Sequence, residues 1–84
     1  MVTFKLIEET EDFLLYWYYP NGDEKTHGII AIDKLTGNIE LRASAPGDKG
    51  RSGQIPMYAF HAIRRIAEAW TKGVALKEGE AIRY

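Results

Sequence analysis

Hydrophobic and polar residues alternate along four short segments in the first half of the chain, as in β-strands whose successive side chains point to opposite faces. The segments are separated by runs of turn-forming residues such as Asn21-Gly22 and Thr36-Gly37. Short turns between successive strands predict an antiparallel meander. The predicted strands are Val2–Ile7, Phe13–Tyr19, Thr26–Asp33 and Asn38–Ser44.

A different period follows, in which apolar residues recur every three or four positions. This spacing predicts an amphipathic helix from about Pro56 to Lys72. Pro56 suits its first position and Gly73 suits the left-handed position after its end, whereas no good capping residue stands directly before Pro56. The apolar stripe expected to cover the sheet consists of Ala59, Phe60, Ala62, Ile63, Ile66, Ala67 and Trp70.

The turns also predict which face of the sheet is the core, because a one-residue shift in pairing turns every side chain of a strand to the opposite face. A turn at Asn21-Gly22 places Leu15 opposite Gly28. A turn near Thr10 places Phe4 near Leu15, and the third hairpin agrees with this choice. The predicted core set is Val2, Phe4, Leu6, Phe13, Leu15, Trp17, Ile30, Ile32, Ile39, Leu41 and Ala43.

The predicted fold is therefore α+β, a four-stranded antiparallel meander packed on one face by a single helix, and residues 1–84 are expected to form one domain. Alternation returns near the end of the chain. The stretch Glu80–Tyr84 is expected to add a fifth short strand or to form an extended arm.

Composition and charge narrow the functional classes. The chain of 84 residues is 45% hydrophobic and has no cysteine, which predicts a globular protein without disulfides or thiolate metal sites. A formal net charge of −1 gives no general attraction to nucleic acid or to an anionic membrane. Acidic residues precede the longest apolar run, which is far shorter than a membrane span, so no membrane association and a cytoplasmic location are expected.

The strand Phe13–Tyr19 is apolar on both faces, so the predicted outer face of the sheet also has an apolar centre. Three explanations are open: the C-terminal arm covers it with Ile82 and Tyr84, a second copy or a protein partner binds it, or it serves as a ligand platform. The residues predicted to form this interaction surface are Leu14, Tyr16, Tyr18, His27 and Ile29.

The loop 45–55, between the last predicted strand and the helix, holds three glycines and two basic residues. These resemble the parts of an anion or nucleotide site at a helix N-terminus. The spacing does not fit a P-loop, and a plain connection is the preferred interpretation. The candidate anion-site residues are Lys49, Arg51 and Ser52.

A further alternative is single-stranded nucleic-acid binding by the aromatic outer face, beside Lys5, Lys25 and Arg42. The slightly acidic net charge disfavours it. The two histidines, His27 and His61, are expected on opposite sides of the molecule without a serine or carboxylate partner. No catalytic residue, metal ligand or cofactor is therefore predicted, the protein is not expected to be an enzyme, and a small-molecule ligand is left open.

Four stretches of the sequence resemble a group of short, uncharacterised bacterial single-domain proteins: Tyr18–Gly22, Gly28–Lys34, Thr36–Glu40 and Tyr58–Ile66. The resemblance covers most of the chain and implies the architecture and a bacterial origin, but it carries over no activity and no catalytic residues. In size and layout the chain also resembles some bacterial toxin-immunity proteins. The leading hypothesis is a non-enzymatic module that self-associates or binds a protein through the outer face.

Overall fold

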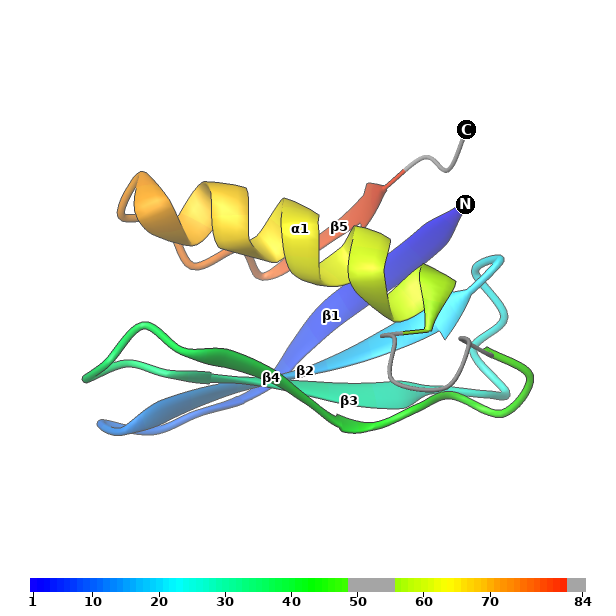
Figure 1. Cartoon of the computed structure of the whole chain (residues 1–84), viewed down its shortest axis with the longest axis horizontal. Helices are drawn as coiled ribbons and strands as arrows, with labels where there is room; N and C mark the ends of the chain where they lie inside the picture. The colour runs from blue at the N-terminus through cyan, green and yellow to red at the C-terminus, as the bar shows by residue number, and fades with distance from the viewer. Residues whose placement is uncertain (49–55, 82–84) are drawn as a thin grey trace.

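The fold is seen in a computed structural model, which describes residues 1–48 and 56–81. Its elements are β1 (Val2–Glu9), β2 (Phe13–Pro20), β3 (Gly28–Asp33), β4 (Ile39–Ala43), α1 (Met57–Thr71) and β5 (Glu78–Ala81). Neighbouring strands are antiparallel in the order β4-β3-β2-β1-β5, and α1 packs on one side of the sheet (Figure 1). The predicted α+β fold is confirmed, and the optional fifth strand is present, at Glu78–Ala81 where the sequence predicted it within Glu80–Tyr84.

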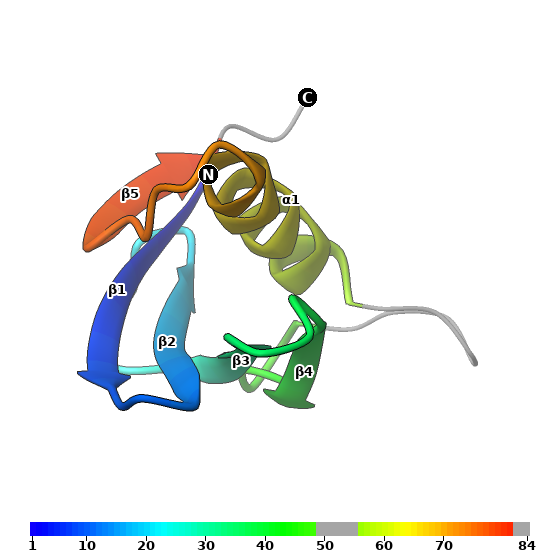
Figure 2. The same ribbon diagram turned by 90° about the vertical axis from the view of Figure 1, so that its left-hand side faces the viewer.

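The sheet curves around α1, so its concave face holds the core and its convex face points away from the helix (Figure 2). The helix contacts all five strands. Its buried positions are mostly small, and they let the helix approach the large side chains of the sheet closely; they are Ala59, Ala62, Ile66 and Ala69. Phe60 was predicted within this stripe, but the residue is 49% exposed.

β2 lies in a register that differs from the predicted one. Tyr18, rather than Leu15, stands opposite Gly28 of β3. Tyr18 also stands opposite Phe4 of β1, where the sequence predicts Leu15. Both pairings are therefore displaced by the same three positions along β2, from residue 15 to residue 18. Because side chains alternate, an odd displacement exchanges the two faces of the strand.

This exchange puts three predicted surface residues into the core. Leu14, Tyr16 and Tyr18 belong to the buried cluster beneath α1, and each is 0% exposed. The prediction that they lie on the exposed outer face is wrong. The predicted core residues that lie on the outer face instead are Phe13, Leu15 and Trp17.

The connection between β2 and β3 explains the displacement. β2 continues to Pro20, and residues 21–27 form a longer connection than the two-residue hairpin predicted at Asn21-Gly22. Asn21 and Gly22 do adopt positive φ angles of 55° and 73°. The Asp23 N–H donates to the Pro20 carbonyl at 3.0 Å, and the Thr26 N–H then donates to the Asp23 carbonyl at 3.2 Å. The chain thus makes a second turn before β3 begins.

The predicted faces of β1, β3 and β4 are largely confirmed. Ile32 pairs with Ile39 and Ile30 pairs with Leu41, as the third hairpin predicts. The core residues contributed by β1 and β3 are Val2, Phe4, Ile30 and Ile32. Ala43 is an exception, because an irregularity in the β3–β4 ladder places it opposite Ile29, and it is exposed.

Gly28 provides space for the Tyr18 ring. A Cβ atom at Gly28 would lie 2.1 Å from Tyr18 Cε1 and 2.7 Å from the carbonyl oxygen of Ala43. Real Cβ atoms do not approach other atoms this closely, so the position requires glycine. The contact between ring and backbone therefore helps to fix the observed register of β2.

β5 extends the sheet beyond β1 instead of crossing its outer face. Ala81 pairs with Val2, and Gly79 pairs with Phe4. The Leu6 N–H donates to the Lys77 carbonyl at 2.7 Å. Ile82 and Tyr84, the predicted cover of the outer face, lie outside the described residues.

Candidate functional site

The convex face opposite α1, which we call the outer face, carries the apolar side chains of β2 that the core does not use. Phe13, Leu15 and Trp17 are partly exposed there. Ile29 pairs with Trp17 and is partly exposed, so the apolar surface continues onto β3, whereas Ala31, opposite Leu15, is buried. No element of the described chain covers these side chains. Contiguous apolar surface of this kind is typical of interaction sites.

Trp17 and His27 are in direct contact on the outer face. Their rings are stacked, with centroids 3.8 Å apart and planes at 11°. The Tyr19 ring meets His27 edge-on at 6.5 Å. The predicted surface residues His27 and Ile29 therefore do lie on the outer face, beside Trp17 instead of Tyr16 and Tyr18. Their role in binding stays a prediction.

Two basic side chains flank the aromatic rings, and each has an acidic partner. Lys5 Nζ lies 2.6 Å from Glu24 Oε1, and this hydrogen bond raises the pKa of Lys5. The same ammonium is 6.0 Å from the centre of the Tyr19 ring. Arg42 Nε lies 3.0 Å from Glu40 Oε1. The glutamates neutralise the positive charges with which Lys5 and Arg42 could otherwise bind the phosphate backbone of a nucleic acid.

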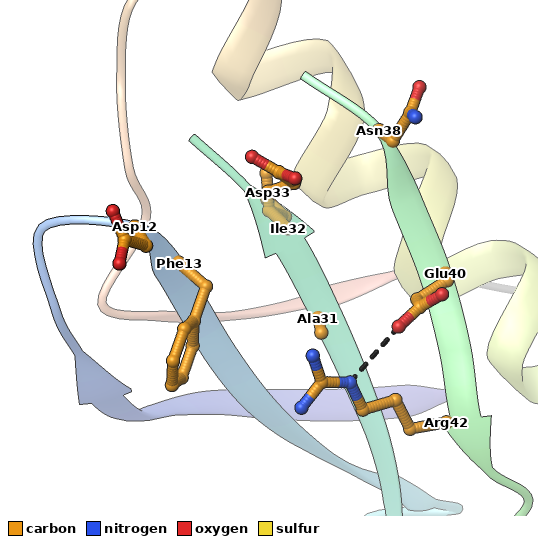
Figure 3. A pocket seen from close by; sticks show the side chains of 8 residues that line it. All are labelled: Asp12, Phe13, Ala31, Ile32, Asp33, Asn38, Glu40 and Arg42. Atoms are coloured by element: carbon orange, nitrogen blue, oxygen red, sulfur yellow. Dashed lines mark hydrogen bonds and ion pairs between the residues drawn. The ribbon is translucent and has the colours of Figure 1, made fainter. Parts of the chain in front are cut away.

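A shallow pocket of about 240 Å³ lies at the Phe13 end of the outer face (Figure 3). Arg42 extends from β4 across β3 towards Phe13, and its guanidinium carbon is 5.7 Å from the ring centre. The pocket is lined by Asp12, Phe13, Ala31, Ile32, Asp33, Asn38, Glu40 and Arg42. Asp33 Oδ1 already accepts the N–H groups of Leu35 and Thr36, which shape the β3–β4 turn. The described residues contain no cluster that could hold a metal ion.

The hydroxyl groups of Tyr16 and Tyr18 are structural. Tyr16 donates to the carbonyl of Leu76, which ties β2 to the segment before β5. Burial raises the pKa of Tyr16 from 10.0 to about 12, and the negative charge of Glu9 adds to the rise. Burial also raises the pKa of Tyr18, and its hydrogen bond from the Ala45 N–H opposes part of that rise.

Asp48 caps the start of α1 from eight residues before Pro56, a position that sequence reasoning missed. The Asp48 carboxylate accepts the backbone N–H of Tyr58 and the backbone N–H of Ala59, each at 3.0 Å. It also accepts the Tyr18 hydroxyl at 2.7 Å. The signal in the sequence was the lack of a capping residue next to Pro56, because unpaired N–H groups at a helix start need an acceptor from elsewhere.

The cap changes the interpretation of the glycine-rich loop. An anion site at the start of α1 would use free backbone N–H groups, and those of Tyr58 and Ala59 already face a carboxylate of the chain itself. The candidate anion-site residues Lys49, Arg51 and Ser52 lie outside the described residues.

Comparisons of the chain with protein-family models, with curated proteins and with solved structures find no match. The resemblance to short bacterial single-domain proteins therefore stays a prediction. Over residues 1–48 and 56–81, no helix is both long and apolar enough to cross a membrane.

Proposed function

We propose that the protein is a non-enzymatic interaction module that binds a protein, or a second copy of itself, through the outer face of β2 and β3. The observation that carries this proposal is the row of partly exposed apolar side chains Phe13, Leu15 and Trp17 opposite the helix. An apolar row that the core does not need is favourable when a partner removes it from water.

The shape of the outer face favours a large partner over a small molecule. Small-molecule sites are concave and surround most of their ligand, whereas this face is convex (Figure 2). A protein partner gains its contacts by covering several strands at once. The stacked Trp17–His27 pair is the expected anchor, because rigid aromatic side chains with a polar atom dominate the binding energy of protein interfaces.

The charges beside the outer face also favour protein over nucleic acid. Lys5 and Arg42, which lie against the Tyr19 and Phe13 rings, are both paired with glutamates. Binding of single-stranded nucleic acid would break these pairs to obtain phosphate contacts. A polar rim of paired charges around an apolar centre is the usual arrangement at protein interfaces.

Site-specific photo-crosslinking tests the proposal. We expect p-benzoylphenylalanine in place of Leu15 to give discrete protein adducts in cells that make the chain, and the Trp17→Ser substitution to suppress them. The matched control carries the same crosslinker in place of Leu35, an apolar residue that is 79% exposed at the β3–β4 turn. Adducts of equal yield from both positions, or none from position 15, would contradict the proposal.

A further inference from the structure

β4 is an edge strand whose free side offers backbone groups for pairing. Within the described residues, only β3 pairs with it. The Asp33 N–H donates to the Asn38 carbonyl at 2.9 Å, which makes Asp33 and Asn38 a hydrogen-bonded pair of the β3–β4 ladder. Such pairs alternate along an antiparallel ladder. The backbone groups of Glu40 therefore turn towards β3, and those of Leu41 turn towards the free edge.

The opposite edge of the sheet, β5, has features that hinder pairing with another copy, and β4 lacks them. β5 has four residues, and its Glu78 and Glu80 would repel the same strand of another copy. β4 contains neither proline nor glycine, and it carries one charge of each sign, Glu40 and Arg42. An edge with opposite charges two residues apart is suited to pairing with itself.

We propose that two copies of the chain associate by antiparallel pairing of their β4 strands, with Leu41 opposite the partner's Leu41. Glu40 then lies opposite the partner's Arg42, and Arg42 lies opposite the partner's Glu40. A slip of two residues in one direction would place Glu40 against the partner's Glu40. A slip in the other direction would place Arg42 against the partner's Arg42. Charge complementarity therefore selects a single register.

In the single chain Arg42 extends across β3 towards Phe13, so pairing between copies requires Arg42 and Glu40 to turn towards the free edge of β4. Arg42 Nε and Glu40 Oε1 are 3.0 Å apart on the outer face, and their side chains are 48% and 65% exposed (Figure 3). The two pairs within the copies are replaced by two pairs between them, with no new burial of charge and with loss of the Arg42–Phe13 contact in each copy. Ile39 and Leu41, on the core side, are only partly buried and gain cover from the second copy. The ladder irregularity after Leu41 limits regular pairing to about Glu40–Arg42, because Ile39 would face the partner's Ala43 beyond that irregularity.

Pairing of this kind makes one continuous sheet from the sheets of the two copies. The two outer faces then lie on the same side, so the dimer presents the rows of apolar side chains from both copies together. The inference depends on β4 alone and does not require the outer face to bind anything.

Light scattering after gel filtration tests the dimer with purified protein. As the protein concentration is raised to about 1 mM, we expect the measured mass to reach twice 9.5 kDa, the mass of a dimer. Glu40→Arg and Arg42→Glu each create two repulsive contacts and are each expected to raise the dissociation constant about tenfold or more. Mixing the two variants in equal amounts is expected to restore dimers, because every Glu then meets an Arg of the other variant.

Two further variants serve as controls. Arg65→Glu reverses an exposed charge on α1, outside the proposed β4 pairing, and should leave the mass unchanged. The double variant Glu40→Arg with Arg42→Glu rebuilds both pairs with reversed polarity and should dimerise, which keeps the test valid if a single variant does not fold. A monomer at all concentrations, a dimer that the single reversals do not weaken, or a mixture that stays monomeric would overturn the proposal. A monomer that still gives crosslinks from position 15 would leave the proposed function standing.

Discussion

Tyr18 shows how one side chain can join distant parts of this small protein. Its ring lies against the bare backbone of Gly28, and its hydroxyl donates to Asp48 and accepts the Ala45 N–H at 2.9 Å. Asp48 in turn caps α1 through two backbone N–H groups. The core strand β2, the segment after β4 and the start of the helix are therefore held by one buried hydrogen-bond network.

Alkaline pH is expected to destabilise the protein through its buried tyrosines. Tyr16 and Tyr18 hold their protons more tightly in the folded state than in the unfolded chain, where the ordinary value is 10.0. This contribution to stability is fully present below pH 10.0 and is lost as the pH rises through the folded-state values, about 12 for Tyr16. The free energy of unfolding should therefore fall above about pH 10 in a series of urea titrations.

The Tyr16→Phe variant is the control for this pH dependence. It removes one of the two groups, so its free energy of unfolding should fall less steeply with pH than that of the wild type. Identical slopes for the two proteins would show that Tyr16 is not the group responsible.

At the scale of elements, the sequence predicted the positions of the strands and the helix, because these depend on the local pattern of apolar residues. Alternation located β1 and β4 and identified their core faces, because each has only one strongly apolar face, and the short β3–β4 turn then fixed the face of β3. β2 is apolar on both faces, so either register gives an apolar core and alternation cannot decide between them. The face of β2 was set by residues 21–27, whose second turn added an odd displacement.

The cap on α1 could not be predicted from the local sequence, for a different reason. Asp48 caps the helix because the chain after β4 brings its carboxylate to the N–H groups of Tyr58 and Ala59. A contact of this kind depends on the tertiary fold and leaves no periodic pattern in the sequence. The lack of a cap beside Pro56 predicts that an acceptor is needed, but it does not identify the residue that supplies it.

Gly28→Ala is the substitution that tests the register of β2 and β3. Its new methyl group would overlap the Tyr18 ring and the Ala43 carbonyl, and we expect a loss of about 3 kcal/mol in the free energy of unfolding. The matched control is Gly47→Ala, at a position with a φ of 84° and no atom within 4 Å of the added methyl group. The control should lose only about 1 kcal/mol, from the backbone alone. Equal losses in a denaturant titration would contradict the observed register.

At the scale of the whole molecule, one curved sheet and one helix produce two unlike faces. The concave face is filled by α1 and by the buried side chains of β2, which include Tyr16 and Tyr18. The convex face keeps Phe13, Leu15 and Trp17 without a cover from the described chain. The proposed function depends on this division, because a reversed β2 would turn the apolar row into core and remove the candidate surface.

Hydroxyl-radical footprinting of the isolated protein, read by mass spectrometry at single residues, tests this division directly. We expect rapid oxidation of Trp17 and Phe13 and strong protection of Tyr16 and Tyr18, because the first pair is partly exposed and the second pair is 0% exposed. Unfolding in urea should remove the difference. Protection of Trp17 together with rapid oxidation of Tyr16 and Tyr18 in the folded protein would contradict the proposed surface.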